Sequence, residues 1–162
     1  LTDKEGKILE TVLLGKAIAL IKKYINLEKD YFWIVYPRNK NINNLHLQVA
    51  GIWDPYQLNQ FDKNNSEKDP NELLEELNLN NNYFSIRGEL VYVNTKKKEI
   101  VIKICSSPPS KRSKYSTFKI IIEGEIPLQF LNNFVSLDVI RDGNTLRMVK
   151  YEIIEKIKSE KV

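Results

Sequence analysis

The amino-acid sequence predicts an α+β fold that is mainly β, with a five-stranded barrel in its C-terminal half. Apolar and polar residues alternate in five segments between residues 83 and 154, which is the period of half-buried strands. The 162 residues are 42% hydrophobic, so one domain, or one domain with a sizeable extension, can bury a core. Because Cys105 is the only cysteine, this core forms without a disulfide within the chain. A single cysteine also suits a reducing, cytoplasmic compartment.

The N-terminal segment is expected to form a helix. Thr2 and Glu5 have the spacing of a capping box, in which each side chain bonds a free backbone N–H of the first turn. Apolar residues then follow at helical spacing, at Ile8, Leu9, Val12 and Leu13. Gly15 interrupts this pattern, and residues 17–21 could continue the helix or begin a strand. We favour a helix that continues to Tyr24.

A β-hairpin is expected next. Residues 31–36 are aromatic or β-branched throughout, and Pro37 is expected to end this strand because proline cannot donate to a ladder. A polar turn over 39–44 leads into an alternating strand with Leu45, Leu47 and Val49 on one face. The aromatic residues of the first strand, with Trp53, Tyr56 and Phe61, are expected to pack in the core. The alternative is an exposed aromatic patch for a protein partner.

A linker and a short acidic helix are expected between the hairpin and the barrel. Residues 61–68 are polar and turn-prone. Asp69 then suits an N-cap and Pro70 the first helical position. We therefore divide the chain into four parts. These are a helix and hairpin extension (1–62), a linker with the acidic helix (63–82), the barrel (83–154) and a charged tail (155–162), with the helices and hairpin packed on the barrel.

The five barrel segments have a recognisable order. They cover residues 83–93, 100–105, 118–123, 135–139 and 145–154, with one helical turn in 127–133. Gly88 falls midway along the first strand, where a small barrel needs a bend, and Asp142-Gly143 predicts a tight hairpin turn. This order resembles the OB-fold, a five-stranded barrel. An open five-stranded sheet and an SH3-like barrel are the competing architectures.

The sequence does not favour a membrane protein. The longest apolar stretch near the start, residues 11–21, is interrupted by Gly15 and Lys16 and is shorter than the ~20 residues of a membrane span. Charged residues precede this stretch, so we expect no signal peptide.

The sequence also lacks the usual signs of an enzyme or a metal site. His46 is the only histidine, on the polar side of a strand, whereas general acid–base catalysis at neutral pH often uses histidine. Cys105 has no second histidine to activate it, and a structural zinc site needs four ligands. The acidic cluster of Glu72, Glu75 and Glu76 fits the solvated face of a helix. We therefore expect a non-enzymatic protein with no cofactor and no metal.

Basic residues are concentrated around the second and third barrel strands and the hairpin turns. They are Lys96, Lys97, Lys98, Lys103, Lys111, Arg112, Lys114, Lys119 and Arg141, with Tyr115 beside the loop residues. In OB-folds this face and the first and last hairpin loops bind oligonucleotides. Cationic side chains displace counterions from phosphates, and an aromatic ring such as that of Tyr115 stacks on bases.

The expected partner is therefore single-stranded nucleic acid, RNA or DNA. The formal net charge of +4 agrees with such a partner but also with an acidic protein. The alternative hypothesis is a protein-interaction or complex-assembly subunit that uses the barrel and the aromatic N-terminal region as a docking platform. An ordinary basic surface that only keeps the protein soluble is the simplest interpretation of the same lysines.

Overall fold

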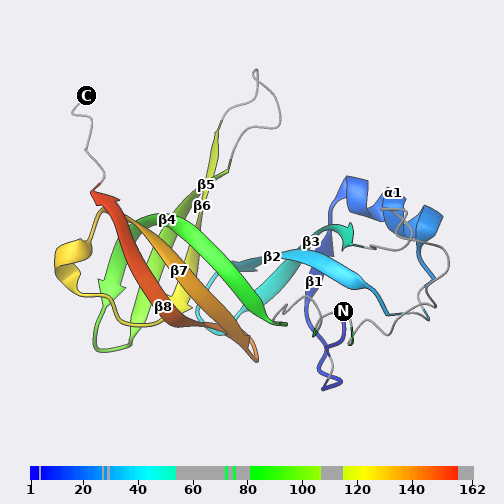
Figure 1. The fold of residues 1–162 in the computed structure, drawn as a ribbon, viewed down its shortest axis with the longest axis horizontal. Helices are drawn as coiled ribbons and strands as arrows, with labels where there is room; N and C mark the ends of the chain where they lie inside the picture. Colours follow the sequence, from blue (N-terminus) through cyan, green and yellow to red (C-terminus); the bar gives the residue numbers. More distant parts are fainter. Residues whose placement is uncertain are drawn as a thin grey trace. The chain divides into compact units, whose positions relative to one another are not determined.

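The chain divides into two compact units, shown in Figure 1. The structure is a computed structural model of residues 1–162, and it describes residues 1–3, 5–26, 28, 30–53, 72, 75, 81–106 and 115–156. The first unit comprises Leu1–Arg38 and His46–Asn81. The second comprises Asn39–Leu45 and Asn82–Val162.

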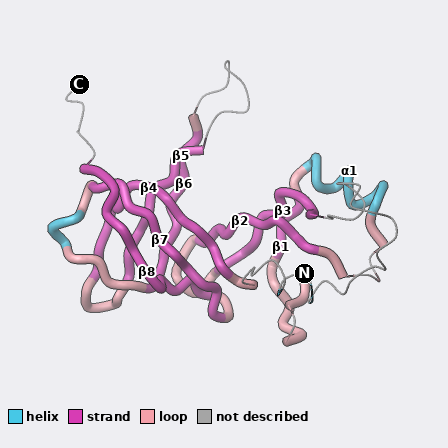
Figure 2. Tube along the Cα trace, in the orientation of Figure 1, coloured by secondary structure: helices cyan, strands magenta, loops and turns pink. Residues whose placement is uncertain are grey.

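The first unit contains a three-stranded sheet and one helix. The elements are β1 (Thr11–Leu13), α1 (Gly15–Tyr24), β2 (Phe32–Asn39) and β3 (Leu45–Trp53). The sheet order is β1-β3-β2, and β1 runs parallel to β3 with Thr11 opposite Leu47. Figure 2 shows these strands and the helix along the Cα trace. The predicted β2–β3 hairpin is thereby confirmed.

The start of the predicted N-terminal helix is wrong, because α1 begins at Gly15. Val12 and Leu13, which were expected in this helix, lie in β1. Ahead of β1 the chain makes a tight turn in which Thr2 bridges Ile8. The Asp3 carboxylate accepts hydrogen bonds from the backbone N–H groups of Glu5 (3.0 Å) and Lys7 (2.8 Å). Gly6 has a φ of +79°, a conformation that glycine adopts at little cost. These local bonds compete with the helical pattern that the apolar spacing indicated.

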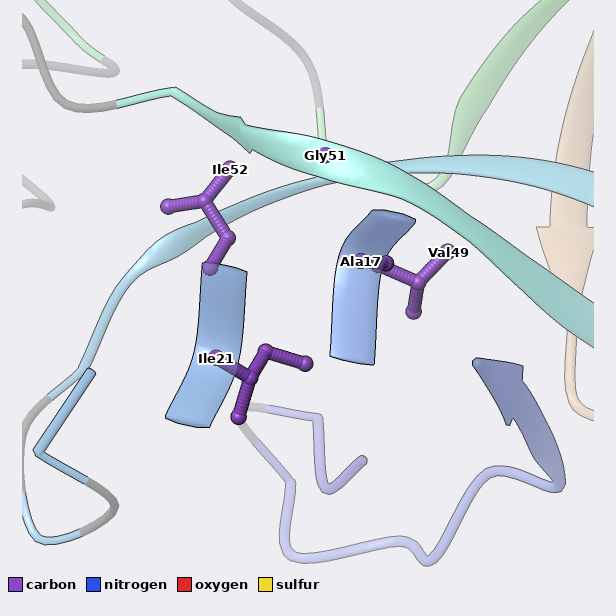
Figure 3. A pocket seen from close by; sticks show the side chains of 5 residues that line it. All are labelled: Ala17, Ile21, Val49, Gly51 and Ile52. Atoms are coloured by element: carbon purple, nitrogen blue, oxygen red, sulfur yellow. The ribbon is translucent and has the colours of Figure 1, made fainter. Parts of the chain in front are cut away.

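Helix α1 covers one face of the sheet. Ala17 is 5% exposed and Val49 is fully buried. Figure 3 shows Ala17 and Ile21 of the helix lining a small apolar depression with Val49, Gly51 and Ile52 of β3. The opposite face of the sheet has no such cover from α1.

Strand β2 continues through Pro37, although the sequence predicted that the strand would end there. Pro37 and Asn39 are both buried within the strand. Since the sheet order is β1-β3-β2, β2 is an edge strand of this sheet. An edge strand tolerates proline, because its missing N–H need not pair with a neighbour. The aromatic strand is only partly core, since Phe32 packs on Trp53 at 5.5 Å while Ile34 and Tyr36 are exposed.

The second unit is the predicted barrel. Its elements are β4 (Tyr83–Asn94), β5 (Glu99–Ser106), β6 (Ser116–Glu123), the 3-10 helix η1 (Leu128–Phe130), β7 (Asn133–Asp142) and β8 (Thr145–Lys156). The strand order β4-β5-β6-β8-β7 closes because β4 pairs with both β5 and β7 (Figure 1). The link between β6 and β8 is the thinnest, with one parallel pair, Glu123 and Arg147. This order confirms the predicted OB-like fold.

Gly88 lies where β4 changes partners, as a bend in the first strand requires. Residues up to Glu89 pair with β7, and residues from Glu89 onward pair with β5. A Cβ at Gly88 would collide with the backbone carbonyl of Lys103 and would lie 2.8 Å from a side-chain carbon of Ile102. Only glycine allows β4 and β5 to approach this closely.

The barrel core contains residues of all five strands, Ile126 between β6 and η1, and one residue of the hairpin tip. Leu90, Ile102, Ile122, Leu137 and Leu146 are fully buried, one from each strand. Leu45, from the tip between β2 and β3, belongs to the same cluster. Such an interior stabilises the unit through the apolar area that it removes from water.

The hairpin tip also satisfies the edge of β6. The Asn39 side-chain amide donates to the Ile121 carbonyl at 2.6 Å, and its oxygen accepts from the Ile121 N–H at 2.9 Å. One side chain thus replaces a missing neighbouring strand at this position.

The β7–β8 hairpin follows the sequence prediction at its turn and extends beyond it at its end. Gly143 has a φ of +62°, as the predicted Asp142-Gly143 turn requires. β8 runs to Lys156, slightly beyond the predicted strand end.

The predicted linker (61–68) lies outside the described residues, as do Tyr56, Phe61 and residues 157–162 of the tail. Of the predicted acidic helix the structure describes only Glu72 and Glu75, which are helical and exposed.

Candidate nucleic-acid interface

The outer face of β5 and β6 carries the central pair of predicted basic residues. Ile100, Ile102, Ile120 and Ile122 point into the barrel, and the residues between them point outward. Lys103 and Lys119 are direct partners across the β5–β6 ladder. Directly opposite residues of an antiparallel pair lie on the same face with their Cβ atoms ~5 Å apart. The fold therefore brings these two lysines together, as expected from the alternation.

Lys103 is partly neutralised by an acidic neighbour. Its Nζ lies 2.9 Å from the Glu89 carboxylate, in a charge-assisted hydrogen bond across the β4–β5 ladder. This hydrogen bond, with the negative charge of Glu89, raises the pKa of Lys103 above its ordinary value. The ammonium therefore stays charged at neutral pH, but part of its field is already compensated. Lys119 is exposed and makes no ion pair among the described residues.

The three lysines of the β4–β5 turn lie at one end of this ladder. Lys96, Lys97 and Lys98 are all exposed. The turn is fixed by the Asn94 side chain, which accepts from the Lys97 N–H at 3.1 Å. Lys98 forms an ion pair of 3.7 Å with Glu125. Lys103 follows Lys98 by five positions, which is roughly 17 Å along a strand. The turn and the central pair are therefore separate basic elements.

The other end of the ladder carries Tyr115. Its side chain is 73% exposed, directly before β6. Ser106 and Ser116 close the ladder here, since the Ser106 hydroxyl donates to the Ser116 carbonyl at 3.1 Å. The loop residues Lys111, Arg112 and Lys114 lie outside the described residues, and their role stays a prediction.

Arg141 does not occupy the exposed position that the sequence analysis expected. It is 9% exposed. Its Nε donates to the Asn82 side chain at 2.9 Å and its NH1 to the Gly143 carbonyl at 3.0 Å. These bonds hold the β7–β8 turn against the start of β4. We therefore leave Arg141 out of the candidate interface.

Tyr92 is an exposed aromatic residue of β4. Strict alternation along β4 puts it on the inward face with Leu90. A bulge between Leu90 and Tyr92 shifts the register, so that Tyr92 lies opposite Val101 and is 45% exposed. Bulges redirect side chains in this way, and no local residue pattern marked this one. We call Tyr92, Val101, Lys103, Lys119 and Ile121 the barrel face.

The residues weighed for catalysis or metal binding are scattered. Cys105 is exposed on β5 opposite Thr117, and His46 is half-buried on β3. Within the described part of the chain, no three His, Cys, Asp or Glu side chains gather in a way that could hold a metal ion. No helix in that part is both long and apolar enough to cross a bilayer.

Strand order, closure and the bend at Gly88 define the class of this protein as an OB-fold. Comparison with known families agrees. Residues 86–155 match the family model described as "Cyanobacterial OB-fold-like RNA-binding domain, C-terminal". Residues 1–60 match the model described as "PatR RNA-binding protein, N-terminal OB-fold domain". The chain is therefore a nucleic-acid-binding module that contains an OB-fold barrel. Its first 60 residues are similar to a second OB-fold domain, which the sequence analysis did not predict, and the structure describes a three-stranded sheet and one helix in that part.

Two further comparisons gave no relatives. No curated protein and no solved structure matches the chain.

Proposed function

We propose that the chain is a non-enzymatic module that binds single-stranded RNA on the barrel face. One observation carries the proposal: the fold sets Lys103 and Lys119 side by side and turns Tyr92 onto the same exposed face. The RNA-binding descriptions of both matching family models support RNA as the ligand.

The barrel face offers two kinds of contact to a single strand. The exposed Tyr92 ring can stack on a base, and the neighbouring Val101 and Ile121 provide an apolar floor. Lys119 can contact a phosphate, while Lys96 and Lys97 extend the positive charge toward one end of β5. Glu89 disfavours phosphate binding at Lys103, because its carboxylate already forms an ion pair with the Lys103 ammonium and would repel a phosphate. Because few lysines of this surface are left for phosphates, we expect few phosphate contacts in the complex and a marked contribution to affinity from stacking on Tyr92.

Salt dependence measures the number of phosphate contacts. Each phosphate neutralised on a single strand contributes ~0.7 to the log–log slope of affinity against salt. Unpaired Lys96, Lys97 and Lys119 alone give a slope of about 2, and the three loop cations raise it to about 4. The measurement is fluorescence anisotropy with a labelled mixed-sequence RNA at several salt concentrations. An absence of binding at low salt would reject the proposal.

Two substitutions test the barrel face itself. Tyr92→Ala is expected to weaken RNA binding about 5- to 100-fold through lost stacking, whereas Tyr92→Phe should retain most of the affinity. Lys119→Ala should lower the salt slope by ~0.7. Lys150→Ala is the matched control, since Lys150 is an exposed lysine on β8 outside the barrel face. Equal losses from Lys119→Ala and Lys150→Ala would show that only overall charge matters.

The preference for RNA is tested with paired ligands. RNA and DNA of the same sequence differ at the 2′-hydroxyl, which is both a donor and an acceptor. Tighter binding of the RNA at equal salt would support RNA as the preferred ligand. Equal affinity would mean that the protein binds single-stranded nucleic acid without distinguishing RNA from DNA.

A further inference from the structure

One face of the sheet in the first unit carries an exposed tyrosine ring with an arginine guanidinium above it. On β2, Pro37 and Asn39 are buried, and the residues that alternate with them face the other way. Ile34 is 47% exposed and Tyr36 is 54% exposed. The Arg38 guanidinium carbon lies 6.0 Å from the centre of the Tyr36 ring. An aromatic ring thus lies in the open, with a cation close to it.

The neighbouring strands continue this surface. On β3, Leu45, Leu47 and Val49 are buried, whereas the alternating residues His46 and Gln48 are only half-buried. Gln48 pairs with Val12 of β1, which is 44% exposed. We call Ile34, Tyr36, Arg38, His46 and Gln48 the sheet face.

The charge of this sheet favours an anionic partner. The three strands β1, β2 and β3 contain no Asp and no Glu. Two exposed carboxylates flank these strands, Glu10 directly before β1 and Asp30 two residues before β2, whereas on the barrel face Glu89 pairs with Lys103 itself. Large contiguous apolar patches are typical of protein-docking sites. Here the exposed apolar side chains alternate with arginine, histidine and glutamine, which suits a nucleotide better.

We propose that the sheet face is a second contact site for the same single-stranded RNA, with a base stacked on Tyr36. This inference rests on the proposed function. Ile34 extends the apolar surface under the base, and Arg38 brings positive charge to the stacked nucleotide. Because the chain tethers the two sites, an RNA long enough to reach both gains affinity through effective concentration.

The test compares tyrosines that differ in position. The RNA has about 20 nucleotides, which is longer than the ~4–16 nucleotides that one OB-fold site binds. Tyr36→Ala is expected to weaken its binding by about 5- to 100-fold. Tyr36→Phe keeps the ring and should keep the affinity. Tyr24→Ala is the matched control, because Tyr24 is 61% exposed with Lys23 Nζ 5.0 Å from its ring, yet it belongs to α1. It should bind like the unmodified chain.

The outcomes separate this inference from the proposed function. If Tyr36→Ala binds normally while Tyr92→Ala binds weakly, the sheet face is not an RNA site and the barrel face stands. A protein partner would then be the remaining use of the sheet face. If the unmodified chain binds no RNA at low salt, both proposals fail. If Tyr36→Ala and Tyr24→Ala weaken binding equally, the effect is not specific to the sheet face and the inference is overturned.

A second measurement needs no variant and covers the case in which Tyr36→Ala does not fold. The unmodified chain is cross-linked by ultraviolet light to the same RNA carrying 4-thiouridine, and the adducts are mapped by mass spectrometry. An adduct within residues 30–38 supports the inference. Adducts confined to residues of the barrel would overturn it.

Discussion

The sheet of the first unit and the barrel of the second unit differ in where their acidic residues lie. Strands β1 to β3 contain none, whereas barrel carboxylates pair directly with barrel cations, Glu89 with Lys103 and Asp142 with Arg147. Each such pair reduces the positive charge that remains for phosphate. Counting lysines in a sequence therefore overestimates a phosphate-binding surface, and unpaired cations are the quantity that matters.

The two units also differ in how they bury apolar surface. The barrel closes around fully buried side chains from every strand, while the sheet is covered by α1 on one face. We expect the barrel to be the more stable unit, because stability varies within a protein with local burial and packing. The predictions below test this difference, from the largest expected effect to the smallest.

Leu137→Ala should be the most damaging substitution. Leu137 is fully buried in β7, opposite Ile86 on β4 and Tyr151 on β8. Its truncation leaves a cavity and should cost about 2–5 kcal/mol in the free energy of unfolding, measured by urea denaturation. Val149→Ala is the control, since Val149 is 62% exposed and its truncation should cost less than ~0.5 kcal/mol. Similar losses in the two variants would contradict a packed barrel core.

Gly88→Ala tests the close approach of β4 and β5. The added methyl group meets the Lys103 backbone, which cannot rotate away, so we expect a loss of about 1–3 kcal/mol. Gly51→Ala is the matched change in the sheet, where the added Cβ meets no described residue within 4 Å other than the chain neighbours of Gly51. Thermal denaturation should show a lower midpoint for Gly88→Ala and little change for Gly51→Ala. A reversed order would show that the strand crossing is not as tight as described.

Asn39→Ala tests whether the hairpin tip belongs to the barrel. The substitution leaves the N–H and carbonyl of Ile121 without their partner, at a cost of about 1–3 kcal/mol. Hydrogen exchange at the Ile121 amide should accelerate in the same variant. Asn44→Ala, in the exposed turn of the same hairpin, should change neither quantity. Unchanged protection of Ile121 in Asn39→Ala would contradict the assignment of the tip to the second unit.

Glu89→Gln should have the smallest effect on stability and an opposite effect on binding. An ion pair that is exposed to solvent contributes little to stability, because water and salt screen it. Because the pair raises the pKa of Lys103, its contribution is present at neutral pH and is lost only as pH rises through that pKa. Removing the carboxylate lowers the pKa of Lys103 toward its ordinary value and frees the ammonium for phosphate. RNA affinity and its salt slope should therefore rise, the slope by ~0.7.

The control for Glu89→Gln is Glu152→Gln. Glu152 is exposed on β8, away from the barrel face, and its removal changes the net charge equally. Tighter RNA binding in both variants to the same degree would mean that the pair with Lys103 has no specific role.

The barrel was largely predictable because its signals are local. Alternation marked each strand, Gly88 marked the bend and Asp142-Gly143 marked the last turn, since each depends on residues close in sequence. The N-terminal helix was predicted too early because Asp3 and Gly6 form a turn that apolar spacing does not reveal. The end of β2 was predicted too early, at Pro37. A strand tolerates proline mainly at the edge of a sheet, and the sequence does not show which strand is at the edge.

The candidate site was predictable in part. Alternation predicted that Lys103 and Lys119 face outward on the second and third barrel strands, whereas their direct pairing came from the register of the ladder. The turn of Tyr92 onto the surface, the burial of Arg141 and the neutralisation of Lys103 by Glu89 did not follow from the sequence, because each depends on which residues become partners across strands.

By itself the sequence determined the five-stranded barrel, the outward position of its central lysines and the exclusion of a disulfide framework. These features depend on the two-residue period of a strand and on residue type, both of which are read locally. Only the tertiary structure decided which cations remain unpaired, that Asn39 completes the edge of β6, and that Tyr36 and Tyr92 reach solvent. Those outcomes depend on register, bulges and strand closure, which bring together residues far apart in the chain.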